Sequence, residues 1–328
     1  MNELFEIVND IINFPQLLMD NCSYLPDSFK IAFLKTIYFV PILVLLYFLI
    51  EVIEKYIIKN IHVFIKFLRS FESLFGAIVG IIPECNIAIL TSLLYSRNII
   101  SRGTLLACLI MCSDEVLPIL FIEPTKALSI IPLLIIKFVL ALAIGFIVDI
   151  TETILNLRIK RKDNLNAVNM DIEEYGCCHH LLNTKEAHPK LIKHTITHTV
   201  YMFIFVLLFL SAIYALGEVY GSIENLAAAC LYNNPLIIFA IAGLGLIPNC
   251  AVSVLIVLLY AVGIISFPAF LAGTITSAGL GMSMLDKRST KRDASITSII
   301  LYISAVAAGI GFYYNFLGIN SLSAIFIK

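Results

Sequence analysis

The strongest constraint on the fold is a stretch that occurs twice: residues 80–107 return 165 positions later as residues 245–272. Of the 28 aligned positions, 13 are identical. They include a Pro-x-Cys motif at 83–85 and at 248–250, and both copies continue with Leu-Leu-Tyr and Ile-Ile-Ser at the same spacing. Apolar composition explains shared Leu and Ile, but not the shared Pro, Cys and Tyr. We therefore interpret the chain as two copies of one unit.

The amino-acid composition places both copies in a membrane. Of the 328 residues, 60% are hydrophobic and only 14% are charged, which is too little polar surface to coat a soluble globule of this size. Eight long apolar tracts predict an all-α polytopic membrane protein whose partner is the lipid bilayer. A net charge of -1 argues against a nucleic-acid partner, because such proteins usually carry a basic surface.

Charge and hydropathy divide the chain into four parts. Residues 1–30 mix apolar and acidic positions without reaching spanning length, so we expect a retained amphipathic segment. Residues 31–155 hold a first transmembrane repeat, residues 156–193 a polar linker, and residues 194–328 a second transmembrane repeat. The uninterrupted spans are predicted at about 31–53, 127–150, 199–216 and 295–317.

The repeated tracts contain residues that interrupt helices. Pro83 and Pro248 lie in the middle of apolar stretches, and polar or glycine-rich residues at 113–115 and 277–281 interrupt the stretches that follow. Proline removes a helix hydrogen bond, and lipid cannot satisfy the carbonyl that is left. We therefore predict broken or re-entrant helices that meet at the membrane midplane, as in secondary transporters.

Basic residues indicate the orientation of the repeats. They cluster after the first span, in the linker and after the second repeat, at 55–69, 158–162 and 287–292. The positive-inside rule places all three clusters in the cytoplasm. The residues around Lys126 and Glu218 then lie outside, so the two repeats are predicted to have inverted topologies.

Three carboxylates lie inside apolar tracts: Glu84, Asp114 and Glu115. Such residues are costly in lipid when charged and commonly mark an ion or proton site. The apolar segments on each side of 113–115 are each only half a span, which argues against a loop at the membrane surface. Oxygen ligands of this kind suit hard cations such as manganese.

Two cysteines, Cys85 and Cys250, occupy equivalent positions beside the helix breaks. We expect both to lie near the substrate cavity, because thiolates suit soft ions. Cys108 and Cys112 are more simply interpreted as packing residues. The complete set of predicted substrate-binding residues is Pro83, Glu84, Cys85, Asn86, Ser113, Asp114, Glu115, Pro248, Asn249, Cys250, Ser277 and Gly279.

The linker contains the run Cys177-Cys178-His179-His180. These residue types bind metals, but their spacing does not match a closed zinc site. A weak metal-binding tract and a solvated linker without metal are both consistent with the sequence.

The motifs around these residues resemble those of the ten-transmembrane heavy-metal exporter family, often described as arsenic efflux proteins. The resemblance rests on Gly-x-Ile-Pro-x-Cys, on Ser113-Asp-Glu-x-x-Pro118, on Gly-Leu-Ile-Pro-Asn-Cys250 and on Ala278-Gly-x-Gly281. Where the family commonly has Pro-Gln-Cys-Gly, this chain has Pro-Glu-Cys-Asn at 83–86. The resemblance implies ten spans and an exporter of heavy metal or metalloid.

The leading hypothesis is a secondary exporter of an arsenite-like metalloid or a divalent cation such as manganese. A small organic anion transporter and, from another class, an intramembrane hydrolase using Asp114 or Glu115 with Glu84 are the alternatives. The chain has no Walker loop or other nucleotide-binding motif, so we expect the energy for transport to come from an ion, the membrane potential or a partner. We expect no enzyme activity and no cofactor, and leave open a coupling proton on Asp114 or Glu115. We expect a multi-pass protein of the bacterial inner membrane with a cytoplasmic linker; whether it forms a homo-oligomer is open.

Overall fold

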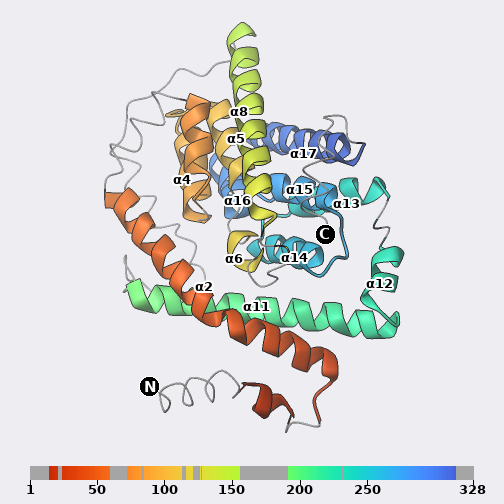
Figure 1. Ribbon diagram of the computed structural model, residues 1–328. Helices are drawn as coiled ribbons and strands as arrows, with labels where there is room; N and C mark the ends of the chain where they lie inside the picture. The colour runs from red at the N-terminus through yellow and green to blue at the C-terminus, as the bar shows by residue number, and fades with distance from the viewer. Residues whose placement is uncertain are drawn as a thin grey trace.

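The computed structural model describes residues 15–20, 24–59, 72–82, 85–112, 116–120, 126, 128–155, 191–230, 232 and 234–314, and every regular element in these parts of the chain is helical (Figure 1). The helices are α2 (Asp27–Lys59), α4 (Cys85–Ser96), α5 (Arg102–Met111), α6 (Val116–Leu120), α8 (Ile130–Ile154), α11 (Leu191–Val219), α12 (Ile223–Ala229), α13 (Leu236–Gly245), α14 (Cys250–Ala261), α15 (Phe267–Thr276), α16 (Gly279–Arg288) and α17 (Lys291–Tyr313). Residues 72–79, before α4, are also helical. The all-α prediction is therefore confirmed for the described residues.

The duplicated sequence folds into duplicated helices and turns. α4 and α14 each have 12 residues, and α14 lies 165 positions after α4. α5 and α15 each have 10 residues and are related by the same shift. In the turns between these helices, Asn98 and Gly263 occupy equivalent positions and have φ values of 61° and 87°. Asparagine and glycine adopt this left-handed conformation more readily than other residues, so the same turn forms twice.

The repeated Ile-Ile-Ser motif explains where α5 and α15 begin. Ser101 is the N-cap of α5, and its Oγ accepts a hydrogen bond from the backbone N–H of Thr104 at 3.2 Å. Ser266 is the N-cap of α15, and Pro268 stands in the first turn, where its missing N–H leaves no helix bond unmade. A serine N-cap can satisfy one of the backbone donors at a helix start. One short motif therefore starts the same helix in each repeat.

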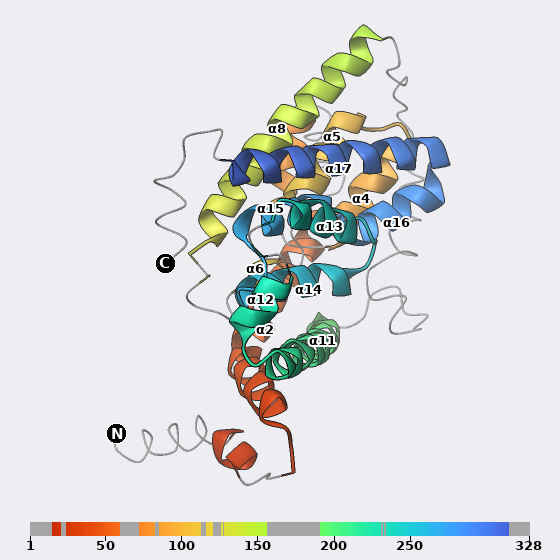
Figure 2. The same cartoon turned by 90° about the vertical axis from the view of Figure 1, so that its right-hand side faces the viewer.

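The broken helices lie between two sets of long helices (Figures 1 and 2). α2 and α11 pack against each other on one side, and α8 and α17 lie on the opposite side. In the most apolar 18-residue stretch of Phe267–Arg288, which covers α15 and α16, 78% of the residues are buried, against 22% in Asp27–Leu49 of α2 and 33% in α8. The short helices therefore form the core, and the long ones carry exposed apolar surface that suits contact with lipid.

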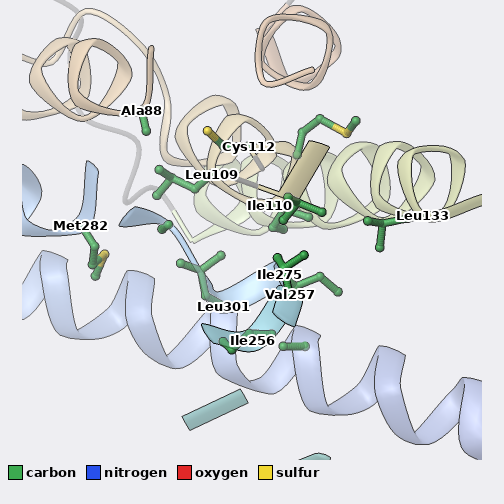
Figure 3. Packing of buried hydrophobic residues seen from close by; sticks show 14 of the residues in the cluster. Ala88, Leu109, Ile110, Cys112, Leu133, Ile256, Val257, Ile275, Met282 and Leu301 are labelled. Carbon is green, nitrogen blue, oxygen red and sulfur yellow. The ribbon is translucent and has the colours of Figure 1, made fainter. Parts of the chain in front are cut away.

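Side chains from both repeats form one hydrophobic cluster (Figure 3). Ile110 of α5 and Ile275 of α15 are equivalent residues, both are fully buried, and they lie close together in Figure 3. α4 of the first repeat also packs closely on α16 of the second: a Cβ added to Gly281 would lie only 2.8 Å from the Cβ of Ala88. The two repeats thus share a single core.

The long helices extend beyond the spans predicted from hydropathy: α2, α8 and α11 each continue for several polar residues at one end or both. The end of the last predicted span, residues 315–317, lies outside the described residues. Within the described parts of the chain, six helical stretches are long and apolar enough to cross a membrane, fewer than the eight predicted tracts. Four lie in the single helices α2, α8, α11 and α17, and two, Arg102–Leu120 and Phe267–Arg288, run across the breaks after α5 and α15. The remaining two predicted tracts hold only the shorter apolar helices α4, α13 and α14, of 10 to 12 residues.

Glycines let the broken helices cross at backbone contact. A Cβ added to Gly80 would lie 2.6 Å from the carbonyl oxygen of Cys108, and one added to Gly245 would lie 2.6 Å from that of Gly273. Gly80 and Gly245 are equivalent in the repeat, and so are Cys108 and Gly273. The same crossing between a helix end and the following broken helix is therefore built twice, and only glycine fits it.

We expect Gly245→Ala to lower the free energy of unfolding by about 1–3 kcal/mol, because the added methyl group overpacks a backbone crossing. Thermal unfolding of the purified protein in detergent measures the loss. Gly243→Ala is the matched control in the same helix, since a Cβ there would meet nothing closer than Tyr302 at 4.0 Å. Equal melting temperatures of the two variants would contradict the crossing as described.

Candidate functional site

The first residues of two equivalent helices touch each other. Cys85 begins α4, and Cys250 begins α14. The two Sγ atoms lie 3.5 Å apart. Cys85 is buried and Cys250 is partly exposed. The repeat therefore brings its two cysteines together as one thiol pair with one sulfur from each half of the chain.

The distance between the two sulfurs suits a shared soft ion. A disulfide would hold them at about 2.05 Å. Two thiolates on one tetrahedral metal with bonds of about 2.3 Å would lie about 3.8 Å apart. The observed 3.5 Å is close to the second value, so a thiophilic ion could be held by both sulfurs with little rearrangement.

The electrostatic environment of the thiol pair comes from the two helix starts. Cys85 and Cys250 are the first residues of their helices, and the N-terminal end of a helix carries a partial positive charge. Two such ends meet at the sulfurs. The two sulfurs, which are the ligands that soft ions prefer, therefore lie where two helix N-terminal ends converge.

The break before Cys250 follows from the sequence Pro248-Asn249. α13 ends at Gly245, and α14 begins only at Cys250. Asn249 is the N-cap of α14, and its side-chain oxygen accepts a hydrogen bond from the backbone N–H of Ala251 at 2.9 Å. In the first repeat, the equivalents Pro83 and Glu84 lie outside the described residues. Asn86 stands in the first turn of α4.

The second break, between α15 and α16, lies beside the start of α14. Ser277, the C-cap of α15, donates a hydrogen bond to Ser253 Oγ at 2.8 Å. Ser253 is one turn after Cys250. Gly279 follows with φ 51° and begins α16. The structure thus brings Ser277 to the helix turn that carries one of the thiols.

The last turn of α5 contacts the middle of α4 in the first repeat. The hydroxyl of Thr91, on α4, donates to the sulfur of Cys108 at 3.6 Å. Cys108 and Cys112, in the last turn and at the C-cap of α5, are both buried. Other contacts join the helix ends themselves: the starts of α4 and α14 meet at the two cysteines, and the end of α15 bonds to α14 through Ser277.

Several predicted site residues lie outside the described residues. They are Pro83, Glu84, Ser113, Asp114, Glu115, and the linker residues Cys177, Cys178, His179 and His180. Among the residues that the structure describes, no group of three or more His, Cys, Asp or Glu side chains could hold a metal ion. The described part of the candidate site is therefore the thiol pair with its flanking helix ends.

A buried lysine in this region was missed by the sequence analysis. Lys137, on α8, is fully buried, and its ammonium donates to the carbonyl oxygens of Cys112 and Thr274, each at 2.9 Å. The signal was present in the sequence, because Lys137 is the single basic residue in the apolar tract 128–150. A charge at such a position rarely faces lipid.

A second missed feature ties the two repeats together at the start of α5. Arg102 forms ion pairs with Glu152 of α8 at 2.8 Å and with Asp293 of α17 at 2.6 Å. Its Nε also donates to the hydroxyl of Tyr95 at 2.9 Å. Asp293 belongs to the second repeat and the other three residues to the first, so this cluster joins the halves through charge.

The equivalent tyrosine, Tyr260, joins the halves without an ion pair. Its hydroxyl donates to Ser129 Oγ, at the start of α8, at 2.9 Å. Its ring stacks on Phe270 with centroids 4.2 Å apart. Phe267 occupies the position equivalent to Arg102, so the repeated tyrosine makes an ionic contact in one half and an aromatic one in the other.

We expect Arg102 and Asp293 to be energetically coupled by about 1 kcal/mol, because contacting residues of a partly buried pair rarely contribute additively. A double-mutant cycle with Arg102→Gln and Asp293→Asn, followed by thermal unfolding in detergent, measures the coupling. Additive effects of the two substitutions would show that the pair does not join the repeats.

The fold and this site define the class of the protein: a multi-pass membrane protein whose described elements are all helical, with short, interrupted helices in its core. Residues 22–180 match the model of the family described as "Putative, 10TM heavy-metal exporter". The match confirms, over these residues, the family resemblance that the motifs carry. No curated protein and no solved structure matches the chain.

Proposed function

We propose that the protein is a secondary exporter of a soft heavy-metal or metalloid ion of arsenite type, and that Cys85 and Cys250 bind the ion. The main observation that supports this proposal is the contact between the two sulfurs at 3.5 Å. The two converging helix starts support a thiolate pair at this place. The description of the matched family supports a heavy metal as cargo and export as its direction.

The thiol pair also bears on the choice between arsenite and manganese. Manganese prefers oxygen ligands, whereas trivalent metalloids and other soft ions prefer sulfur. Where the equivalent helices α4 and α14 meet at their first residues, the contacting atoms are two sulfurs. We therefore propose the soft ion as substrate, with Glu84, Asp114 and Glu115 as further oxygen groups and Asp114 or Glu115 as carrier of a coupling proton.

We further propose that the two repeats have inverted topologies in the bacterial inner membrane and open to opposite sides in turn. The equivalent helix pairs α4 and α14, and α5 and α15, support this reading. Each half-helix of 12 residues is about 18 Å long, about half of a spanning length. In transporters built this way, the substrate lies where the broken helices of both repeats meet.

In cells that lack other resistance, we expect Cys85→Ser and Cys250→Ser each to abolish arsenite resistance and raise cellular arsenic, because a hydroxyl does not replace a thiolate toward a soft ion. Cys230→Ser is the matched control, since Cys230 ends the peripheral helix α12. Arsenic accumulation and purified protein yield are measured together. Arsenite resistance that survives in both variants would refute the thiol site. Efflux of a small organic anion instead of arsenite would favour the organic anion transporter.

For the topology, we expect Lys126 and Glu218 outside the cell and Lys160 and Lys287 inside, because basic clusters stay in the cytoplasm. Single cysteines at these four positions, in a background with the native thiols replaced by serine or alanine, are labelled with a membrane-impermeant maleimide in intact cells. Labelling of Lys126→Cys and Lys160→Cys from the same side would overturn the inverted arrangement.

A further inference from the structure

The ammonium of Lys137 lies at the ends of two equivalent helices. Its Nζ donates to the carbonyl oxygen of Cys112, the C-cap of α5, at 2.9 Å. It also donates to the carbonyl oxygen of Thr274, in the last turn of α15, at 2.9 Å. α5 and α15 contact each other. One positive charge is therefore held by one helix end from each repeat.

Helix ends of this kind form a cation site. The last four carbonyls of a helix have no partner within it, and the C-terminal end carries a partial negative charge. In membrane transporters, the C-terminal ends of half-helices and unwound carbonyls hold the coupling cation, commonly sodium. In this chain the carbonyls of both helix ends are bonded instead to a side chain that is 0% exposed.

We propose that Lys137 occupies the coupling-cation position of this protein, so that its tethered ammonium replaces a bound sodium ion and transport needs no sodium. The proposal rests on the proposed transport function and names a residue outside the thiol pair. In this proposal the ammonium has two roles. It satisfies the carbonyls of α5 and α15, and it holds the two repeats together in the conformation that the structure shows.

Lys137 is connected to the thiol region through the same helix end. Thr274 is one turn before Ser277, and Ser277 bonds to Ser253 in the first turn of α14. A movement of the ammonium away from α15 would therefore free the helix end that supports the start of α14. This connection gives the lysine a means to couple its position to the shape of the substrate site.

The second repeat supplies no equivalent charge. Gly145 of α8 and Gly309 of α17 contact equivalent residues, Gly103 and Pro268, and this alignment places Leu301 of α17, fully buried, at the position of Lys137. The cation site is thus single although the helix ends that form it are duplicated. Tyr302→Phe provides the control, because it changes the next residue of α17, whose hydroxyl lies 3.5 Å from the carbonyl oxygen of Phe239, without touching the carbonyls of α5 or α15.

The first test measures thermal stability of purified, full-length protein in detergent, with choline, sodium or methylammonium as the cation of the buffer. We expect wild-type protein and Tyr302→Phe to melt at the same temperature in all three. Lys137→Ala should melt lower in choline and recover as sodium or methylammonium is added, because a small cation can then enter the vacated site. A Lys137→Ala protein that melts like wild type in choline would overturn the proposal.

The second test measures metalloid efflux from proteoliposomes in the same three salts. Wild-type efflux should not depend on sodium, and Lys137→Met, which keeps the length but not the charge, should lose efflux by about tenfold or more, without rescue by any cation. Lys137→Arg should retain more activity than Lys137→Met. Sodium-dependent wild-type efflux, or full activity of Lys137→Met, would overturn the proposal. If Lys137→Ala does not fold, the efflux of Lys137→Met alone decides whether the lysine has this role.

The two tests separate this inference from the proposed function. If wild-type protein moves no metalloid, the proposed function fails, while the cation dependence of melting in Lys137→Ala still supports or overturns the role of the lysine. If the cysteine variants lose efflux but the lysine variants behave like wild type, the thiol site stands and the tethered-cation role is wrong.

Discussion

The backbone groups left without partners at the helix breaks are the constraint on which the structure depends. Lipid cannot satisfy them, so a broken helix has to end inside protein. The chain collects these ends in its core: the starts of α4 and α14 meet at Cys85 and Cys250, and the ends of α5 and α15 meet at Lys137. Asn249 caps a helix start, and Ser277 links a helix end to α14. Because the unpaired backbone groups of the helix ends have to be satisfied inside the protein, two thiols and a charged side chain are brought into the same core.

Much of this arrangement could be predicted from the sequence, because both repetition and interruption leave marks in it. The Pro-x-Cys motif indicated the break before Cys250, and equivalence in the repeat predicted that both cysteines lie near one substrate cavity, although not that their sulfurs touch. Lys137 could have been found by the same hydropathy argument that identified Asp114. The Arg102 cluster could not, since its partner Asp293 is 191 residues away and no local pattern pairs the two.

The two halves have kept the backbone of the repeat and changed its charges. Arg102 corresponds to Phe267, so one repeated tyrosine contacts an ionic cluster and the other contacts aromatic rings. Lys137 corresponds to the buried Leu301, so this position supplies an ammonium only in the first half. The helix starts and turns tolerate little change because backbone geometry requires Ser, Gly or Asn there. Side chains that face the other half are less restricted, and the functional differences between the repeats are concentrated in them.

A thiol pair with one sulfur from each repeat also bears on how such a chain could arise. A single half carries one such cysteine and would complete the pair only by associating with a second copy of itself. In such an ancestral dimer every mutation would alter both ligands at once. Fusion of two gene copies removes that restriction, because each position can then diverge alone. Lys137 and Arg102, each without a counterpart of like charge, are residues of the kind that only the fused chain could acquire on one side.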